Sequence, residues 1–304
     1  MDNQNISCDS FFPCTSADVL VSSTVLGLCC VLGVPGNLAV LVLLAHHIKE
    51  GSFTPKLMLS LAVSDLLSLI FLPVWIYALL NGWVFGQALC KLFSYVVYWS
   101  LYSSVLSVTL LSVQRYLQVL YPQRWAKLGQ KGQKGLIFGI WTLGGTLASY
   151  ALYFRNLRLK KDGLLRCYQD FRSNQEKVIV LLLENLVMFV VPLCSLLRYY
   201  YQLHRRINQS ASYRRHRLTK LAIRIVVTFF IFGTPCMINN FVDMAVSWES
   251  DVSYNVTGAL FFINSCVNPF LYAFSARSLL FRGRPDSDQP NQNESNITQH
   301  NQNE

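Results

Sequence analysis

The stretch LLSVQRYLQV, residues 110–119, is the most informative about the fold, because it puts Gln114 and Arg115 at the end of an otherwise apolar run. Residues 92–109, just before it, contain no charged side chain. The whole run, residues 92–120, is long enough to cross the hydrocarbon core of a bilayer as a helix, which takes roughly 20 apolar residues. Because a charged group inside a membrane costs about 3 kcal/mol on insertion scales, Arg115 is a candidate functional residue.

Similar apolar runs recur along the chain, which is 52% hydrophobic and only 14% charged, a composition too apolar for a soluble protein of this length. They cover residues 19–45, 57–80, 136–154, 178–203, 221–247 and 255–274. We therefore predict an all-α membrane protein, a seven-transmembrane helix bundle with a short amphipathic helix after the seventh span. Residues 1–18 form the segment before the bundle, 19–274 the bundle, and 275–304 the amphipathic helix and a disordered polar tail. The amphipathic stretch SARSLLFRGR, residues 275–284, is expected to lie on membrane lipids.

The positions of Lys and Arg predict the orientation. Most of them lie in the connections 46–56, 115–134 and 198–224 and at the start of the tail, and such short basic loops face the cytoplasm. An odd number of spans then places the amino terminus outside, as expected of a multi-pass plasma-membrane protein. The net charge of +10 follows from this topology, so we expect no nucleic-acid partner. Asn5 and Asn255 begin glycosylation sequons in segments predicted to be outside.

Several polar residues lie within the predicted spans. Asp65 is the deepest acid, and an isolated carboxylate does not stay ionised in hydrocarbon without polar or cationic neighbours. Ser104, Asn264 and Asn268 are the candidate neighbours, together with Asn37. Two interpretations stay open: a hydrogen-bond network that joins helices, or a site for a small hard cation such as an allosteric sodium ion. We expect no other cofactor.

Motifs distributed over all the spans resemble those of the rhodopsin-like (class A) G-protein-coupled receptors. They are Gly36-Asn37, LAVSD at 61–65, Cys90 ahead of Arg115-Tyr116, Trp141, Cys167, Pro192 with Tyr200, Pro235, and NPFLY at 268–272. The resemblance covers residues 18 to about 282 and implies a heterotrimeric G protein as partner. It implies that the sixth helix pivots at Pro235 above Phe229, and that Tyr116, Tyr200 and Tyr272 act with Arg115 in activation.

Cys90 and Cys167 fall in segments predicted to be outside, where a disulfide between them would hold the second outer loop over the helix ends. Whether Cys8 pairs with Cys14 stays open.

Two residues depart from the family pattern. Gln114 stands where the family carries an acid, and a neutral amide cannot form an ion pair with Arg115. We expect about 1 kcal/mol less restraint at rest, and therefore raised basal signalling. Gly233 stands where the family usually carries a tryptophan, so either Phe229 and Phe232 replace that ring or coupling is atypical.

The predicted outer half favours an anionic ligand. The seventh span has no lysine for retinal, and the third has no aspartate for an amine. The segment 155–177 is instead rich in basic residues: Arg155, Arg158, Lys160, Lys161, Arg166, Arg172 and Lys177. We predict a ligand site made by Arg155, Lys177, Glu184, Tyr102 and Asn240.

The stretches YFRN, ENLVMFVVP and SLYSSVL resemble the leukotriene B4 receptors of the chemoattractant branch. This implies an anionic lipid chemoattractant such as a hydroxylated fatty acid, an inhibitory G protein and a role in chemotaxis. The alternatives are a receptor for a peptide chemoattractant and a non-signalling scavenger or decoy receptor. An enzyme is not expected, because the histidines all fall in predicted cytoplasmic segments and no His/Cys spacing forms a metal site.

Overall fold

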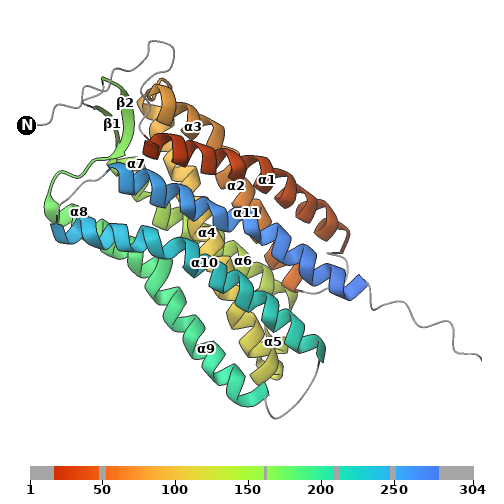
Figure 1. The fold of residues 1–304 in the computed structure, drawn as a ribbon. Coiled ribbons are helices and arrows are strands. Elements are labelled where there is room, and N and C mark those ends of the chain that lie inside the picture. Colours follow the sequence, from red (N-terminus) through yellow and green to blue (C-terminus); the bar gives the residue numbers. More distant parts are fainter. Residues whose placement is uncertain (1–16, 48–52, 161–162, 208–212, 247–250, 281–304) are drawn as a thin grey trace, which may run out of the picture.

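The computed structural model describes the backbone of residues 17–47, 53–160, 163–207, 213–246 and 251–280, and the structural statements below concern this part of the chain (Figure 1). Side chains are described for residues 17–45, 53–160, 163–202, 205, 223–245 and 255–271. Cys8, Cys14 and the sequon at Asn5 lie outside these ranges, as does the tail after Leu280.

Long helices that run side by side make up the molecule (Figure 1). The helices are α1 (Ala17–His47), α2 (Phe53–Leu69), α3 (Leu72–Asn81), α4 (Gly86–Leu120), α5 (Pro122–Lys127), α6 (Gly129–Ala148), α7 (Tyr150–Phe154), α8 (Asn174–Asn185), the π-helix η2 (Leu186–Val190), α9 (Val191–Ile207), α10 (Tyr213–Val246) and α11 (Asp251–Leu280). Two strands, β1 (Arg155–Leu159) and β2 (Leu165–Gln169), form an antiparallel hairpin. We call the end of the bundle that carries this hairpin the hairpin end.

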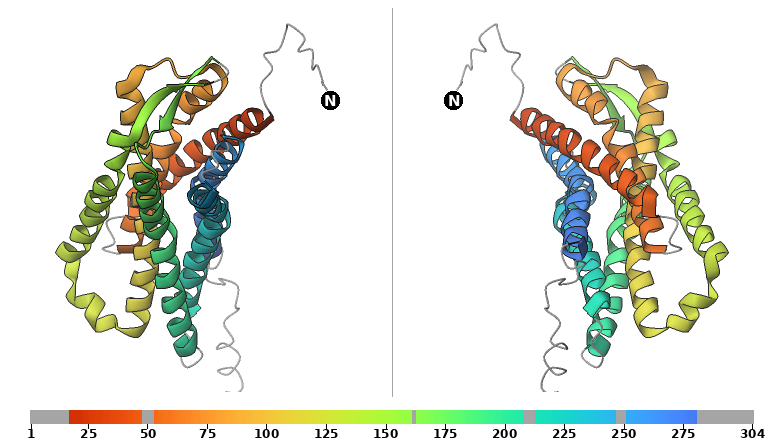
Figure 2. Two further views of the ribbon diagram at one scale, coloured as in Figure 1. Left: turned by 90° about the vertical axis from the view of Figure 1, so that its left-hand side faces the viewer. Right: turned by 90° about the vertical axis from the view of Figure 1, so that its right-hand side faces the viewer.

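The predicted spans appear as continuous or slightly broken helices. Within the described residues, 6 helical segments are long and apolar enough to cross a membrane: Ala17–Ala45, Phe53–Asn81, Gly86–Leu120, Gly129–Phe154, Asn174–Gln202 and Ile223–Ala245. Helix α11 packs against α1, α2 and α10 and completes the predicted seven. Figure 2 shows α1 and α11 together on one flank of the bundle. The all-α membrane bundle predicted from the sequence is confirmed.

Helix α11 runs without a break through Leu280. The separate amphipathic helix expected over residues 275–284 stays a prediction, because residues 281–284 lie outside the described residues.

Proline accounts for two of the breaks. Pro73 lies at the start of α3, and because it has no backbone N–H it ends the hydrogen-bond pattern that α2 would otherwise continue. Pro192 follows η2, where one turn of π-helix inserts an extra residue into the helix. This turn changes the direction of the side chains that precede Pro192, including Glu184 and Asn185.

The bundle has apolar side chains outside and many polar ones inside, as expected in lipid. Val31, Leu43, Phe138 and Ile231 are among the large exposed apolar residues. Small residues let helices approach closely: a Cβ on Gly144 of α6 would lie 2.6 Å from Ser103 Oγ of α4.

Tryptophan side chains join the helices around this contact. The Trp141 indole donates to Ser60 Oγ at 3.0 Å, and the Trp99 indole donates to the Trp141 carbonyl at 2.8 Å. Helices α2, α4 and α6 are thereby tied into one unit.

The hairpin is fixed to the bundle at several points. A disulfide between Cys90 and Cys167 joins β2 to the start of α4, which confirms the predicted bridge. The Trp83 backbone N–H donates to the Leu165 carbonyl at 2.7 Å, and Arg166 donates to the carbonyls of Ala78 and Leu79 at the end of α3.

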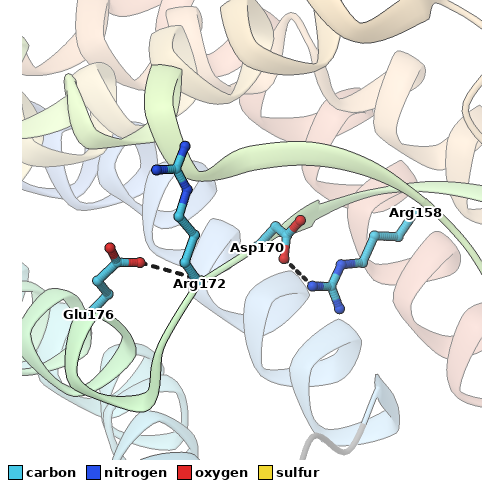
Figure 3. A network of polar contacts seen from close by, with 4 residues as sticks. All are labelled: Arg158, Asp170, Arg172 and Glu176. Atoms are coloured by element: carbon cyan, nitrogen blue, oxygen red, sulfur yellow. Dashed lines mark hydrogen bonds and ion pairs between the residues drawn. The ribbon is translucent and has the colours of Figure 1, made fainter.

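Polar contacts close the connection from the hairpin to α8 (Figure 3). Arg158 forms an ion pair with Asp170, and Glu176 accepts a hydrogen bond from the Arg172 backbone N–H at 3.0 Å. The Ser173 hydroxyl in turn accepts from the Glu176 N–H and caps the first turn of α8.

Candidate functional site

A cavity of about 310 Å³ lies between the helices at the hairpin end. Its walls come from α1, α3, α4, the hairpin, α8, η2, α10 and α11. This volume is in the range of small-molecule sites, which are mostly apolar with a few placed polar groups. We call the part lined by hairpin residues the upper part, and the part lined by Phe189, Gly233 and Phe261 the foot.

The upper part of the cavity is basic. Arg155, Lys160 and Arg166 line it, and the acids of the cavity lining are Asp18 and Glu184. The ammonium group of Lys160 lies 4.7 Å above the ring of Tyr168, which keeps the charge at the wall. A cavity whose walls carry several cations attracts anionic ligands.

Arg155 is held in one orientation. Its side chain is 5% exposed, and the guanidinium donates to the Tyr98 hydroxyl at 2.8 Å and to the Cys167 carbonyl at 3.3 Å. The same guanidinium lies 5.4 Å from the centre of the Tyr98 ring. Gln87 donates to the Arg155 carbonyl at 2.9 Å and fixes the backbone. A buried cation with a fixed orientation is a ready partner for a carboxylate.

A second polar group lies on the α8 side of the cavity. Glu184 lines the cavity within electrostatic reach of Arg155. The next residue, Asn185, accepts a hydrogen bond from Asn240 of α10 at 3.2 Å, while its own Nδ2 has no partner among the described residues. A carboxylate acceptor next to an amide donor complements a hydroxyl group, which donates and accepts at once.

The structure brings together three of the five predicted ligand residues: Arg155, Glu184 and Asn240 all line the cavity. Lys177 does not. It forms an ion pair with Asp243 at 2.6 Å and joins α8 to α10. Tyr102 is also absent from the lining, because it is buried behind Tyr98 with ring centres 6.5 Å apart.

Sequence reasoning missed Tyr98 and Asn185. Tyr98 precedes Tyr102 by one helical turn and faces the same side, so helical periodicity could have indicated it. Asn185 directly follows Glu184 in the apolar run 178–203, so a second polar residue inside a predicted span could have indicated it.

Asn255, predicted as a glycosylation site, also lines the cavity, and its amide donates to Asp18 at 3.3 Å. The glycosylation of Asn255 stays a prediction.

Aromatic rings close the foot of the cavity. Phe229 packs against Phe261 with ring centres 5.8 Å apart, and Phe189 packs edge-on against Phe230 at 4.8 Å. Phe229, Phe189 and Val105 form the buried centre of this cluster. The ring partners of Phe229 among the described residues are thus Phe230, at 5.5 Å, and Phe261, whereas the predicted partner Phe232 makes no ring contact with it.

Asp65 is the centre of a buried polar network below the cavity. The carboxylate is 0% exposed and accepts hydrogen bonds from Ser104 at 3.3 Å and from Asn268 at 2.8 Å. The amide oxygens of Asn264 and Asn268 are buried without a hydrogen-bond partner among the described residues. Of the predicted neighbours, Ser104 and Asn268 thus meet Asp65 across α2, α4 and α11, and Ser265 of α11 is a further partner that the sequence did not indicate. Asn264 is buried on the same helix as Asn268, and the unpartnered amide oxygens fit the ligand preference of a small hard cation.

Arg115 is held by α2. Its guanidinium donates to the Thr54 hydroxyl at 2.8 Å and to Gln118 at 3.1 Å. Gln114 does not bond to Arg115: its amide donates to the same Thr54 oxygen at 2.9 Å. The hydroxyl of Thr54, a neutral acceptor on α2, therefore binds Arg115 in place of the ion pair that an acid at position 114 would form. Sequence reasoning did not identify Thr54.

Of the other predicted activation residues, Tyr200 and Tyr116 lie close to Arg115 or next to it along the chain. Tyr200 of α9 lies near Arg115 and Ser112. Tyr116 bonds to Gln202 and stacks on Tyr199 with ring centres 4.8 Å apart. Pro235 lies inside α10, and Tyr272 lies in α11 beyond the residues whose side chains are described.

Residues 36–272 match the family described as 7 transmembrane receptor (rhodopsin family). The chain belongs to this rhodopsin family of receptors.

The receptor is 31% identical over 276 residues to leukotriene B4 receptor 1 of Homo sapiens, covering 86% of this chain and 78% of that protein. It is 29% identical over 279 residues to C-X-C chemokine receptor type 2 of Mus musculus, with 86% and 78% covered. It is 27% identical over 266 residues to the type-2 angiotensin II receptor of Homo sapiens, with 80% and 73% covered.

The predicted class is confirmed: the protein is a rhodopsin-like G-protein-coupled receptor of the chemoattractant branch, and not an enzyme. As a member of this family it is a multi-pass membrane protein that binds a ligand and couples to a heterotrimeric G protein.

Proposed function

We propose that the receptor responds to an anionic hydroxylated lipid, a leukotriene B4-like fatty acid, and activates an inhibitory G protein to direct chemotaxis. In the plasma membrane the hairpin end and the amino terminus face outward, and the end that carries Arg115 faces the G protein. The observation that carries the proposal is the buried, oriented Arg155, which lines one cavity together with Glu184 and Asn185.

The division of the cavity into a basic upper part and an apolar foot supports the proposal of an amphiphilic ligand. The carboxylate of the ligand pairs with Arg155 in the basic upper part, which Lys160 and Arg166 also line. A ligand hydroxyl donates to Glu184 and accepts from Asn185, whose amide Nδ2 has no other described partner. The similarity to a receptor named for leukotriene B4 agrees with this chemistry.

Signalling follows from a shift between two arrangements of the bundle. Ligand contacts in the outer half favour the arrangement in which α10 pivots at Pro235. Arg115 then leaves Thr54 and repacks with Tyr200 and Tyr272 at the G-protein side. A sodium ion held by Asp65, Ser104, Asn264 and Asn268 would favour the resting arrangement, so sodium and agonist oppose each other.

The test is a screen of hydroxylated fatty acids against chemoattractant peptides, with agonist-driven nucleotide exchange on a purified inhibitory G protein as the readout. We expect a fatty acid to be active and Arg155→Ala to weaken it about tenfold or more, because a hydrogen bond to a charged group contributes roughly 1.5–3 kcal/mol. Arg158→Ala is the matched control, since Arg158 lies on the same strand but its side chain is 55% exposed and paired with Asp170.

A peptide ligand is the second candidate, because relatives are named for chemokines and for angiotensin II. Peptide activity without lipid activity would replace the lipid proposal. Ligand binding without nucleotide exchange on any G protein would instead indicate a scavenger or decoy.

A further inference from the structure

The two ends of the cavity differ in chemistry. The charged residues of the lining are Asp18, Arg155, Lys160, Arg166 and Glu184. The foot is lined instead by Met188, Phe189, Gly233, Met237 and Phe261. None of these side chains carries a charge or a hydrogen-bonding oxygen or nitrogen. The foot therefore stabilises a hydrocarbon group and offers nothing to a second polar group.

Gly233 keeps the foot open. This buried residue lines the cavity, and a Cβ built on it would meet the rings of Phe189 and Phe261 at 3.5 Å each. That is ordinary contact distance, so one methyl group fits between the rings without displacing them. Any side chain that extends beyond Cβ would have to fill the cavity or push the rings apart.

The distance between the polar groups and the foot suits an extended chain. Gly233 and Asn240 both line the cavity from α10, seven residues apart, which is about 10 Å along a helix axis. A ligand whose hydroxyl binds at Glu184 and Asn185 therefore has an apolar path to Gly233. The thioethers of Met188 and Met237 adapt to an unbranched chain, because methionine side chains are flexible and polarisable.

We infer that the foot around Gly233 is a tail subsite that selects the ligand by the length of its terminal hydrocarbon chain. The inference rests on the proposed lipid function and goes beyond it by assigning the opposite end of the ligand. The end of the tail contacts Phe189 and Phe261, two of the rings that pack with Phe229 below the cavity.

The experiment uses a series of hydroxy fatty acids that share the same carboxylate and the same arrangement of hydroxyl groups. Successive members differ by one methylene group in the terminal hydrocarbon tail. In the wild-type receptor, potency is expected to rise about fourfold for each methylene buried in the foot and to stop rising when the foot is full. Gly233→Leu fills the foot, so the tail length that gives the highest potency becomes shorter by several methylenes. In Gly233→Ala the added methyl group fits between the rings, and the tail length of highest potency is expected to fall by about one methylene.

Gly258→Leu is the matched control. Gly258 lines the same cavity from α11, next to Thr257 and Ala259, and a Cβ there meets nothing within 4 Å. This variant is expected to change potency by the same factor for all tails and to leave the best length unchanged. The position of the optimum does not depend on how much receptor reaches the surface, so Gly233→Ala decides the question if Gly233→Leu folds poorly.

The outcomes separate the two proposals. A wild-type receptor that no member of the series activates overturns the lipid function, and the tail subsite with it. A wild-type length optimum that is unchanged in both Gly233 variants overturns the tail subsite alone, as does an equal shift of the optimum in Gly258→Leu.

Discussion

Removing the Thr54 hydroxyl is expected to release Arg115. The Thr54 oxygen accepts hydrogen bonds from Arg115 at 2.8 Å and from Gln114 at 2.9 Å. Thr54→Ala removes this shared acceptor and leaves Arg115 with Gln118 at 3.1 Å as its described partner. The side chain of Arg115 is then free to reach the G-protein side of the bundle.

The size of the effect follows from the charge on the guanidinium. A hydrogen bond to a charged group contributes about 1.5–3 kcal/mol. If the bond to Thr54 forms only at rest, losing about 1.5 kcal/mol raises the active-to-resting ratio about tenfold. Basal signalling should therefore rise about tenfold while the active fraction is small, and agonist affinity should rise with it.

The assay is agonist-free nucleotide exchange on a purified G protein, with equal amounts of receptor in lipid nanodiscs. Thr54→Ser keeps the hydroxyl and should behave like the wild type, whereas Thr54→Val keeps the shape and should behave like Thr54→Ala. Equal basal exchange in all four receptors would refute the conclusion that Thr54 restrains Arg115.

Three further predictions concern other polar groups. Gln114→Glu places an acid beside Arg115 and should lower basal nucleotide exchange severalfold; unchanged exchange at matched surface expression would contradict it. Asp65→Asn should remove the effect of sodium on agonist affinity, measured by agonist competition in sodium and in a larger organic cation; a sodium effect that survives this change would exclude Asp65 as the cation ligand. Lys177→Ala and Asp243→Ala should each lower the melting temperature of the purified receptor, and the double variant should cost less than the sum, because the two residues form one ion pair. Additive losses would show that the pair contributes nothing.

The bundle itself was predictable because lipid imposes length and composition on every span. Apolar runs of about 20 residues indicated the helices, and the basic connections indicated their direction. The bridge between Cys90 and Cys167 and the meeting of Asp65 with Ser104 and Asn268 followed from position and from the family resemblance.

The details of the site were less predictable, because they depend on which neighbour a polar side chain reaches first. Lys177 appeared to be a ligand residue from its charge, yet Asp243 on another helix is close enough to pair with it. Gln114 was predicted to restrain Arg115 less than an acid would, yet the sequence did not indicate that both side chains bind Thr54, which is distant from them along the chain. Asn185 lines the cavity just before the π-helix, whose extra residue changes the register between this part of the span and Pro192 in a way that the sequence does not indicate.

The covalent attachment of the hairpin has a kinetic consequence. The Cys90–Cys167 bond and the contact from Trp83 to Leu165 hold one wall of the cavity in place. A bound molecule therefore cannot escape by lifting this wall as a unit and has to wait for side chains around it to rotate. Such a barrier slows dissociation without adding a contact, so the response should outlast the removal of ligand from the medium, and mild reduction should shorten it.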